Sequence, residues 1–174
     1  LIASLSALSF IIMMFNIPIP GGTSGHAVGA SLIAILFGPW IASVCVSLVL
    51  FIQALVFGDG GVTTFGANAL LMAFASSFSS YYIFQILKTK SFAPYVSGWV
   101  SVVCSSLVLT LFLGIQPLIA TLDGQPLYFP FGFDVTFPAV VGSHILFFGV
   151  VEGIFTGIAY RYIVKNRIYK GVNA

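Results

Sequence analysis

The stretch from Trp40 to Phe57 reads WIASVCVSLVLFIQALVF and contains no charged side chain, no proline and no glycine. A membrane-spanning helix needs about 20 predominantly apolar residues, so this stretch approaches the length of one crossing. Spanning elements are helices or closed barrels, because hydrocarbon cannot satisfy open backbone groups. The alternation of polar and apolar residues that is typical of barrel strands is missing here. The stretch therefore predicts a transmembrane helix.

The rest of the chain has the same character. Of its 174 residues, 59% are hydrophobic and 6% are charged, whereas a soluble domain carries about 25% charged residues. Residues 1–58, 60–87 and 91–122 contain no Asp, Glu, Lys or Arg. This composition predicts a polytopic integral membrane protein, in one domain over residues 1–174, and excludes a soluble enzyme. The net charge of +2 is too small to indicate a nucleic-acid partner.

Loop signals divide the chain into apolar segments. Two prolines and three glycines within residues 16–25 exclude a regular helix there, and Gly38-Pro39 predicts a tight turn that starts the next helix. The chain begins inside an apolar run, without Met and without the preceding basic residue of a signal peptide; we interpret it as a fragment. The prediction is an all-α transmembrane bundle with six helices, at about residues 1–15, 26–37, 40–57, 67–87, 95–115 and 138–164.

Charged residues predict the orientation. All basic residues follow the fourth segment or lie at the C-terminal end, namely Lys88, Lys90, Arg161, Lys165, Arg167 and Lys170. The positive-inside rule makes both places cytoplasmic, so the loops at 16–25, 58–66 and 116–137 are expected outside. Three of the four acids lie in those outer loops. Loop 116–137 is either a lid or an interfacial belt of aromatic residues.

Small residues recur four apart on three segments, a spacing that lets helices approach closely in lipid. The last segment carries the longest example, a glycine at every fourth position. Two interpretations stay open: packing within this subunit, or docking to another membrane subunit. The residues are Gly149, Gly153, Gly157, Ala3, Ala7, Ala30 and Ala34.

His26 follows the Pro-Gly loop at the predicted start of the second segment. We expect Ser24 or Thr23 to cap that helix. The helix dipole would then favour neutral imidazole, which is the form that binds a metal. A hydrogen-bonded interfacial histidine without a ligand role is the alternative.

His144 and Glu152 lie eight residues apart on the last segment and hence roughly on one helical face. At 1.5 Å per residue, Glu152 is expected about 12 Å deeper. Ionisable residues inside a membrane are costly and often functional, and an internal polar bridge that fixes helix packing is the alternative. Cys45 and Cys104 form no C-x-x-C pair and predict apolar packing.

Glycine-rich backbone at membrane depth occurs where it is buried or lines a cavity. Residues 16–26 and 57–68 are therefore predicted to frame an external pocket for a small solute. Asn68 either orients a ligand there or caps the following helix. Asp59 lacks the regular oxygen-ligand spacing of a calcium loop.

Long motifs now carry a resemblance that covers nearly the whole chain. The sequence resembles the CbiM/NikM family, the metal-capture (S) subunits of energy-coupling-factor transporters for nickel and cobalt. The matching stretches are PIPGGTSGHAVGA at 18–30, LFGPW at 36–40, QALVFGDGGVTT at 53–64, GAN at 66–68, and His144 with Glu152-Gly153.

The resemblance implies a full subunit of about seven helices whose external amino terminus begins Met-His and plugs into the protein. The terminal amine, the second residue's backbone and imidazole, and one further imidazole then hold the metal. That imidazole maps onto His26, with Thr23, Ser24, Asn68 and His144 as surrounding pocket candidates. Nitrogen ligands suit Ni²⁺, and the Gly-Gly-Thr-Ser-Gly-His form of the loop looks more like the nickel branch; Co²⁺ is the alternative substrate.

The resemblance also implies partners in the membrane of a prokaryotic cell. A membrane-embedded T component and two ATPase subunits would reorient the S subunit and release the ion inward, and a small accessory membrane subunit is a further possible partner. The chain has no G-x-x-x-x-G-K-[ST] motif of its own, so it is expected to be a transport subunit and not an enzyme.

Two readings from other classes remain. Gly22-Thr23-Ser24-Gly25 fits the short G-x-S-G motif of an intramembrane serine protease, with His144 as the base of a Ser24/His144 dyad. A purely structural membrane subunit is the third, in which metal transport would be indifferent to His26.

Overall fold

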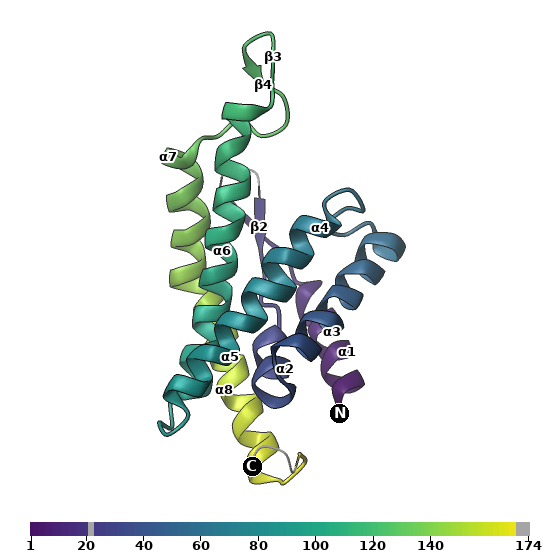
Figure 1. The fold of residues 1–174 in the computed structure, drawn as a ribbon, viewed down its shortest axis with the longest axis vertical. Helices are drawn as coiled ribbons and strands as arrows, with labels where there is room; N and C mark the ends of the chain where they lie inside the picture. The colour runs from purple at the N-terminus through teal and green to yellow at the C-terminus, as the bar shows by residue number, and fades with distance from the viewer. Residues whose placement is uncertain (21–22, 170–174) are drawn as a thin grey trace.

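The computed structural model describes residues 1–20 and 23–169. Gly21 and Gly22 of the Pro-Gly loop and Lys170 of the basic C-terminal end lie outside the described residues. The described chain forms six helical segments, as the sequence predicted (Figure 1). These are α1 (Ile2–Met13), α2 (Ala30–Phe37), α3 with the π-helical η1 (Pro39–Ile52, Gln53–Phe57), α4 with η2 and α5 (Phe65–Asn68, Ala69–Ala75, Ser76–Leu87), α6 (Ala93–Ile119), and α7 with η3, η4 and α8 (Phe133–Thr136, Phe137–Val141, His144–Phe148, Gly149–Lys165).

Four of these segments are long and apolar enough to cross a membrane, within the described part of the chain. They are Pro39–Phe57, Phe65–Leu87, Ala93–Ile119 and Phe133–Lys165. Large apolar side chains lie exposed on their outer surfaces, for example Leu146 at 79%. Lipid is the solvent in which such a surface is stable.

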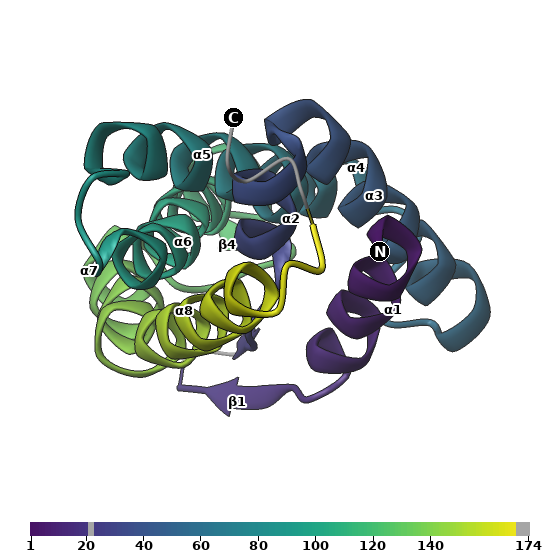
Figure 2. The same cartoon turned by 90° about the horizontal axis from the view of Figure 1, so that it is seen from below.

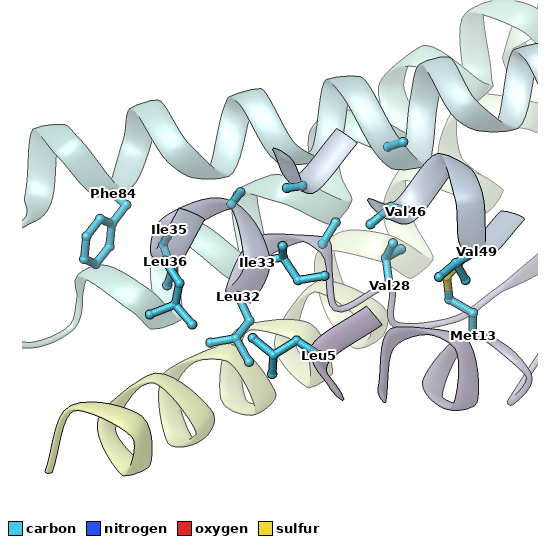
Figure 3. Close-up of a cluster of buried hydrophobic side chains, with 14 of the residues drawn as sticks. Leu5, Met13, Val28, Leu32, Ile33, Ile35, Leu36, Val46, Val49 and Phe84 are labelled. Carbon is cyan, nitrogen blue, oxygen red and sulfur yellow. The ribbon is translucent and has the colours of Figure 1, made fainter. Parts of the chain in front are cut away.

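The short helix α2 forms the centre of the bundle. Every residue from Ala30 to Leu36 is buried, and the helix contacts α1, α3, α5, α6 and α8 (Figure 2). Its Leu32 and Ile33 pack among Leu5 of α1, Val46 of α3 and other members of the main apolar cluster (Figure 3). Eight residues at 1.5 Å each are too few to cross a bilayer, so α2 is a core helix surrounded by longer ones.

The glycine face of the last segment is used inside this chain, against α6. An added Cβ on Gly153 would lie 2.7 Å from the Tyr95 carbonyl oxygen, and one on Gly149 would lie 2.9 Å from the Trp99 ring. On the α6 side, a Cβ on Gly98 would lie 2.8 Å from the Glu152 carbonyl oxygen. Packing within the subunit is thus the interpretation that holds for this face.

The alanine pairs differ from each other. Ala30 and Ala34 are fully buried within α2. Ala3 and Ala7 are exposed and line an apolar groove between α1 and α3.

The loops at 16–25 and 116–137 contain two short hairpins that the sequence did not predict. The antiparallel pair β1 (Ile17–Ile19) and β2 (Thr23–Gly25) aligns Ile17 with Gly25. The pair β3 (Thr121–Leu122) and β4 (Gln125–Pro126) turns through Asp123 and Gly124, both with positive φ.

Three predicted boundaries were wrong. The fifth helix ends at Ile119 instead of residue 115, with Pro117 inside it. The second helix begins at Ala30 instead of residue 26, because residues 23–25 are held in the β1–β2 hairpin and Gly29 adopts a φ of 74°. The last segment begins at Phe133 instead of residue 138. Pro138 is the second residue of η3 and lies within the continuous segment.

Candidate metal site

One cavity of about 200 Å³ collects all the pocket residues that the sequence singled out. Residues from the β1–β2 hairpin and the 58–60 loop meet residues of α6 and of the last segment around it. Its lining consists of Asn16, Thr23, Ser24, Gly25, His26, Val28, Asp59, Gly60, Asn68, Leu71, Met72, Val102, Ser105, Ser106, Leu109 and His144. The structure thereby brings together Thr23, Ser24, His26, Asn68 and His144, which are far apart in the sequence.

His26 lies in the irregular segment between β2 and α2 and is partly buried. Its Nδ1 is 3.0 Å from the Ala27 carbonyl oxygen. A carbonyl only accepts, so Nδ1 carries the proton and Nε2 keeps its lone pair. Burial lowers the pKa of the His26 imidazole, against the opposing effects of the Ala27 carbonyl and the Asp59 charge. The ring is therefore neutral at pH 7, with Nε2 as a potential metal ligand.

His144 presents the same arrangement from the opposite part of the chain. Its side chain is buried, and Nδ1 donates to the Val140 carbonyl oxygen at 2.7 Å. The ring also packs on Phe148, with the centroids 5.0 Å apart. Nε2 is again the nitrogen left as an acceptor in the neutral ring. Two imidazoles oriented by backbone carbonyls thus line one cavity.

The predicted helix cap is absent. Thr23 and Ser24 belong to β2, and the N-cap of α2 is Gly29, without a side-chain cap bond. The Ser24 hydroxyl instead donates to Asn16 Oδ1 at 3.5 Å. Both residues remain on the cavity wall.

Asn68 also has a different role from helix capping. It ends α4, and its Nδ2 donates to the Gly60 carbonyl oxygen at 3.0 Å. Asn16 Nδ2 lies 3.5 Å from Asp59 Oδ1 in the same loop. These contacts connect the 58–61 loop to α4 and to Asn16, the residue directly before β1.

Glu152 is the residue whose role the sequence did not predict. Its carboxylate is fully buried and accepts hydrogen bonds from the backbone N–H groups of Val28 and Gly29, two and three residues after His26. The expected internal polar bridge exists, but it runs to backbone groups more than 120 residues away. Only the tertiary fold supplies that connection.

Gly25 is a second residue whose role the sequence did not predict. A Cβ at this position would overlap the Phe148 ring, which lies in a small cluster with Ile19 and Val102. The hairpin that precedes His26 is therefore pressed directly onto the last segment. The G-H pair in the motif was a signal for this close approach, although not for the partner.

The donor set is poor in acids. Within residues 1–20 and 23–169, no group of three or more His, Cys, Asp or Glu side chains lies close enough together to hold a metal ion. The described part also contains no hydrogen bond between Ser24 and His144. The Ser24 hydroxyl is bonded to Asn16, and the His144 ring to Val140 and Ser143. The arrangement lacks the assembled dyad of a serine protease and offers neutral nitrogen atoms instead.

Comparison with known proteins places the chain in a family. The model of the cobalt uptake substrate-specific transmembrane region, CbiM, matches residues 1–168. The chain belongs to the CbiM family. A solved transition metal transporter has the same fold, with a TM-score of 0.92 and 43% identity over 97% of this chain and 77% of that one. A truncated transition metal transporter superposes with a TM-score of 0.91 and is 44% identical, over 95% of this chain and 79% of that one.

Among curated relatives, a probable fused nickel transport protein, LarMN, of Lactiplantibacillus plantarum is 41% identical over 92% of this chain and 50% of its own length. A putative metal transport protein of Methanocaldococcus jannaschii is 40% identical over 96% of this chain and 75% of its own length. The cobalt transport protein CbiM of Anoxybacillus flavithermus is 29% identical over 94% and 64%. The chain thus spans between half and three quarters of these relatives. All three relatives are named as metal transport proteins.

Proposed function

We propose that this chain is the substrate-capturing part of an importer that takes up Ni²⁺ from outside the cell. The observation that carries the proposal is the cavity in which His26 and His144 are both held by backbone carbonyls through Nδ1. Neutral imidazole nitrogen suits Ni²⁺ and Co²⁺. An acid-rich site would instead favour Ca²⁺ or Mg²⁺.

His26 is the proposed direct ligand, through Nε2. Thr23, Ser24, Asn68 and His144 surround the ion's position as pocket residues, and the remaining nitrogen ligands would come from a Met-His amino terminus of the full subunit. The hydrogen bond from His26 Nδ1 to Ala27 supports this assignment, because a ligand histidine usually donates its other ring N–H to an acceptor that fixes the tautomer.

The proposed partners are a membrane-embedded T component, two ATPase subunits and a small accessory membrane subunit, in the cell membrane of a prokaryote. The sequence has no phosphate-binding loop, so ATP hydrolysis would belong to the partners. In the proposed orientation the cavity opens outward and the C-terminus is cytoplasmic.

Nickel is the proposed ion because the relatives named for nickel transport are more similar in sequence than those named for cobalt transport, at 37–41% against 29–32% identity. Calorimetric titration of the full-length protein with Ni²⁺ and with Co²⁺ tests the choice. Tighter binding of Co²⁺ would reverse it, and binding of neither would refute metal capture.

We predict that His26→Ala in the full-length protein abolishes high-affinity nickel uptake, since it removes a direct ligand. Uptake of radioactive Ni²⁺ by cells that also express the partner subunits is the measurement. Ser43→Ala is the matched control, because Ser43 is buried and hydrogen-bonded to Pro39 and Ala73 but lies outside the cavity. Uptake with unchanged affinity in the His26 variant would refute the ligand assignment.

A Ser24→Ala variant separates transport from proteolysis, because only a protease would lose all turnover.

A further inference from the structure

We infer that Glu152 is a positioning residue for metal capture, which holds the backbone after His26 so that the imidazole faces the ion. The inference rests on the proposed role of His26. Glu152 lies on α8, and its Oε2 accepts from Val28 N at 2.8 Å and from Gly29 N at 3.0 Å. Its Oε1 lies 3.0 Å from Gly29 N as well. The carboxylate thus accepts hydrogen bonds from two consecutive backbone N–H groups.

These peptide units lie where the chain enters α2. The first N–H groups of a helix have no partner within the helix, and a carboxylate at that end is favoured by the helix dipole. The two N–H groups that Glu152 accepts from belong to the N-cap Gly29 and to Val28, directly before the first helical residue Ala30. Glu152 therefore holds the entry of α2 from a different helix, as a capping-box glutamate holds the N-cap N–H within one helix.

A second element holds the same peptide from the other side. Ser9 of α1 donates its hydroxyl proton to the Val28 carbonyl oxygen at 2.6 Å. Gly29 passes close to this serine, because a Cβ there would lie 3.4 Å from Ser9 Cα. The stretch Val28-Gly29 is consequently fixed between α8 and α1, and both contacts are buried.

The hydrogen bonds from Glu152 and Ser9 to the Val28-Gly29 stretch also constrain His26, through the backbone between them. His26 lies in no helix or strand, and residues 26–29 have no regular structure that could fix it. Its ring is bonded to the carbonyl of Ala27, the residue directly before Val28. Any shift of Val28 relative to α8 therefore moves the carbonyl that orients the imidazole.

Glu152→Gln in the full-length protein is the test. The side chain keeps its shape, but it loses the negative charge, and an amide NH₂ takes the place of Oε1, which accepts from Gly29 N. We expect calorimetric Ni²⁺ affinity to fall roughly 10- to 100-fold, as for other groups that orient a metal ligand. The ligand-field absorption of the bound Ni²⁺ should also shift, which a general loss of stability would not cause. Without metal, hydrogen exchange of the peptide spanning 26–30 should be faster.

Thr156→Val is the matched control. Thr156 lies one turn further along α8 and is equally buried, and its hydroxyl has no hydrogen-bond partner among the described residues. Its variant should bind Ni²⁺ as the wild type does, with an unshifted spectrum. Equal losses in both variants would make the effect structural and overturn the inference.

Ser9→Ala keeps the inference testable if the Glu152 variant fails to fold. It should weaken affinity several-fold, and wild-type affinity in a folded Ser9→Ala protein would then overturn the inference. If a folded Glu152→Gln protein keeps the wild-type Ni²⁺ affinity and spectrum, the positioning role of Glu152 is overturned, while the role of His26 stands. If the wild type binds neither Ni²⁺ nor Co²⁺, the proposed function fails first and the positioning role falls with it.

Discussion

His26 owes its position to neighbours, because it lies in no helix or strand. Gly25 on one side is pressed against Phe148, and the backbone on the other side is held by Glu152. A residue without regular structure around it loses its geometry when one of these contacts changes. Small changes beside His26 are therefore expected to have larger effects than similar changes elsewhere.

Gly25→Ala tests this at a single position. The new methyl group would overlap the Phe148 ring, and overpacking of this kind costs about 1–3 kcal/mol. We expect a lower unfolding temperature in detergent together with weaker Ni²⁺ binding. Gly66→Ala is the control, because Gly66 lies in α4 with no atom within 4 Å of an added Cβ; there, alanine should be neutral or slightly stabilising. Equal behaviour of the two variants would contradict the close approach of Gly25.

At the scale of elements, the contact of α6 with the last segment supports the site. The glycines of that segment face Tyr95 and Trp99, and the same segment carries His144 and Glu152. Small residues are required because the two backbones approach closely. Separation of these helices would move both side chains away from the hairpin.

Gly153→Ala is predicted to destabilise this contact. Its methyl group would lie 2.7 Å from the Tyr95 carbonyl oxygen, which backbone rigidity keeps in place, so a loss of about 1–3 kcal/mol is expected. Gly142→Ala, in the same segment with nothing within 4 Å and helical φ and ψ, should leave stability unchanged or raise it. Thermal unfolding in detergent measures both. A Gly153 variant as stable as the Gly142 variant would refute the tight contact.

For the whole molecule, charge and apolar surface together indicate how the bundle lies in the membrane. The α5–α6 connection, which carries Lys88 and Lys90, lies at the end opposite the β3–β4 hairpin (Figure 1). The C-terminal part of α8, with Arg161 and Lys165, lies at the same end as this connection. The positive-inside rule predicts that this end faces the cytoplasm.

Cysteine labelling tests the orientation. In a background without Cys45 and Cys104, a membrane-impermeant maleimide added to intact cells should label Gln125→Cys and not Thr89→Cys, since both positions are exposed but lie at opposite ends. Permeabilised cells, in which both must react, provide the control. Labelling of Thr89→Cys alone in intact cells would invert the proposed topology.

From the amino-acid sequence alone, the membrane environment, the helical segments and the family could be predicted. Long uncharged stretches such as Trp40–Phe57 admit little else than spanning helices, and the motif around His26 identified the region of the site. Three features could be seen only in the folded chain: His26 precedes α2 instead of starting it, Asn68 holds the 58–61 loop, and Glu152 accepts hydrogen bonds from Val28 N and Gly29 N. Hydropathy and local motifs report near neighbours and the surrounding solvent. Contacts between residues more than 100 positions apart depend on how the helices pack, which neither periodicity nor composition encodes.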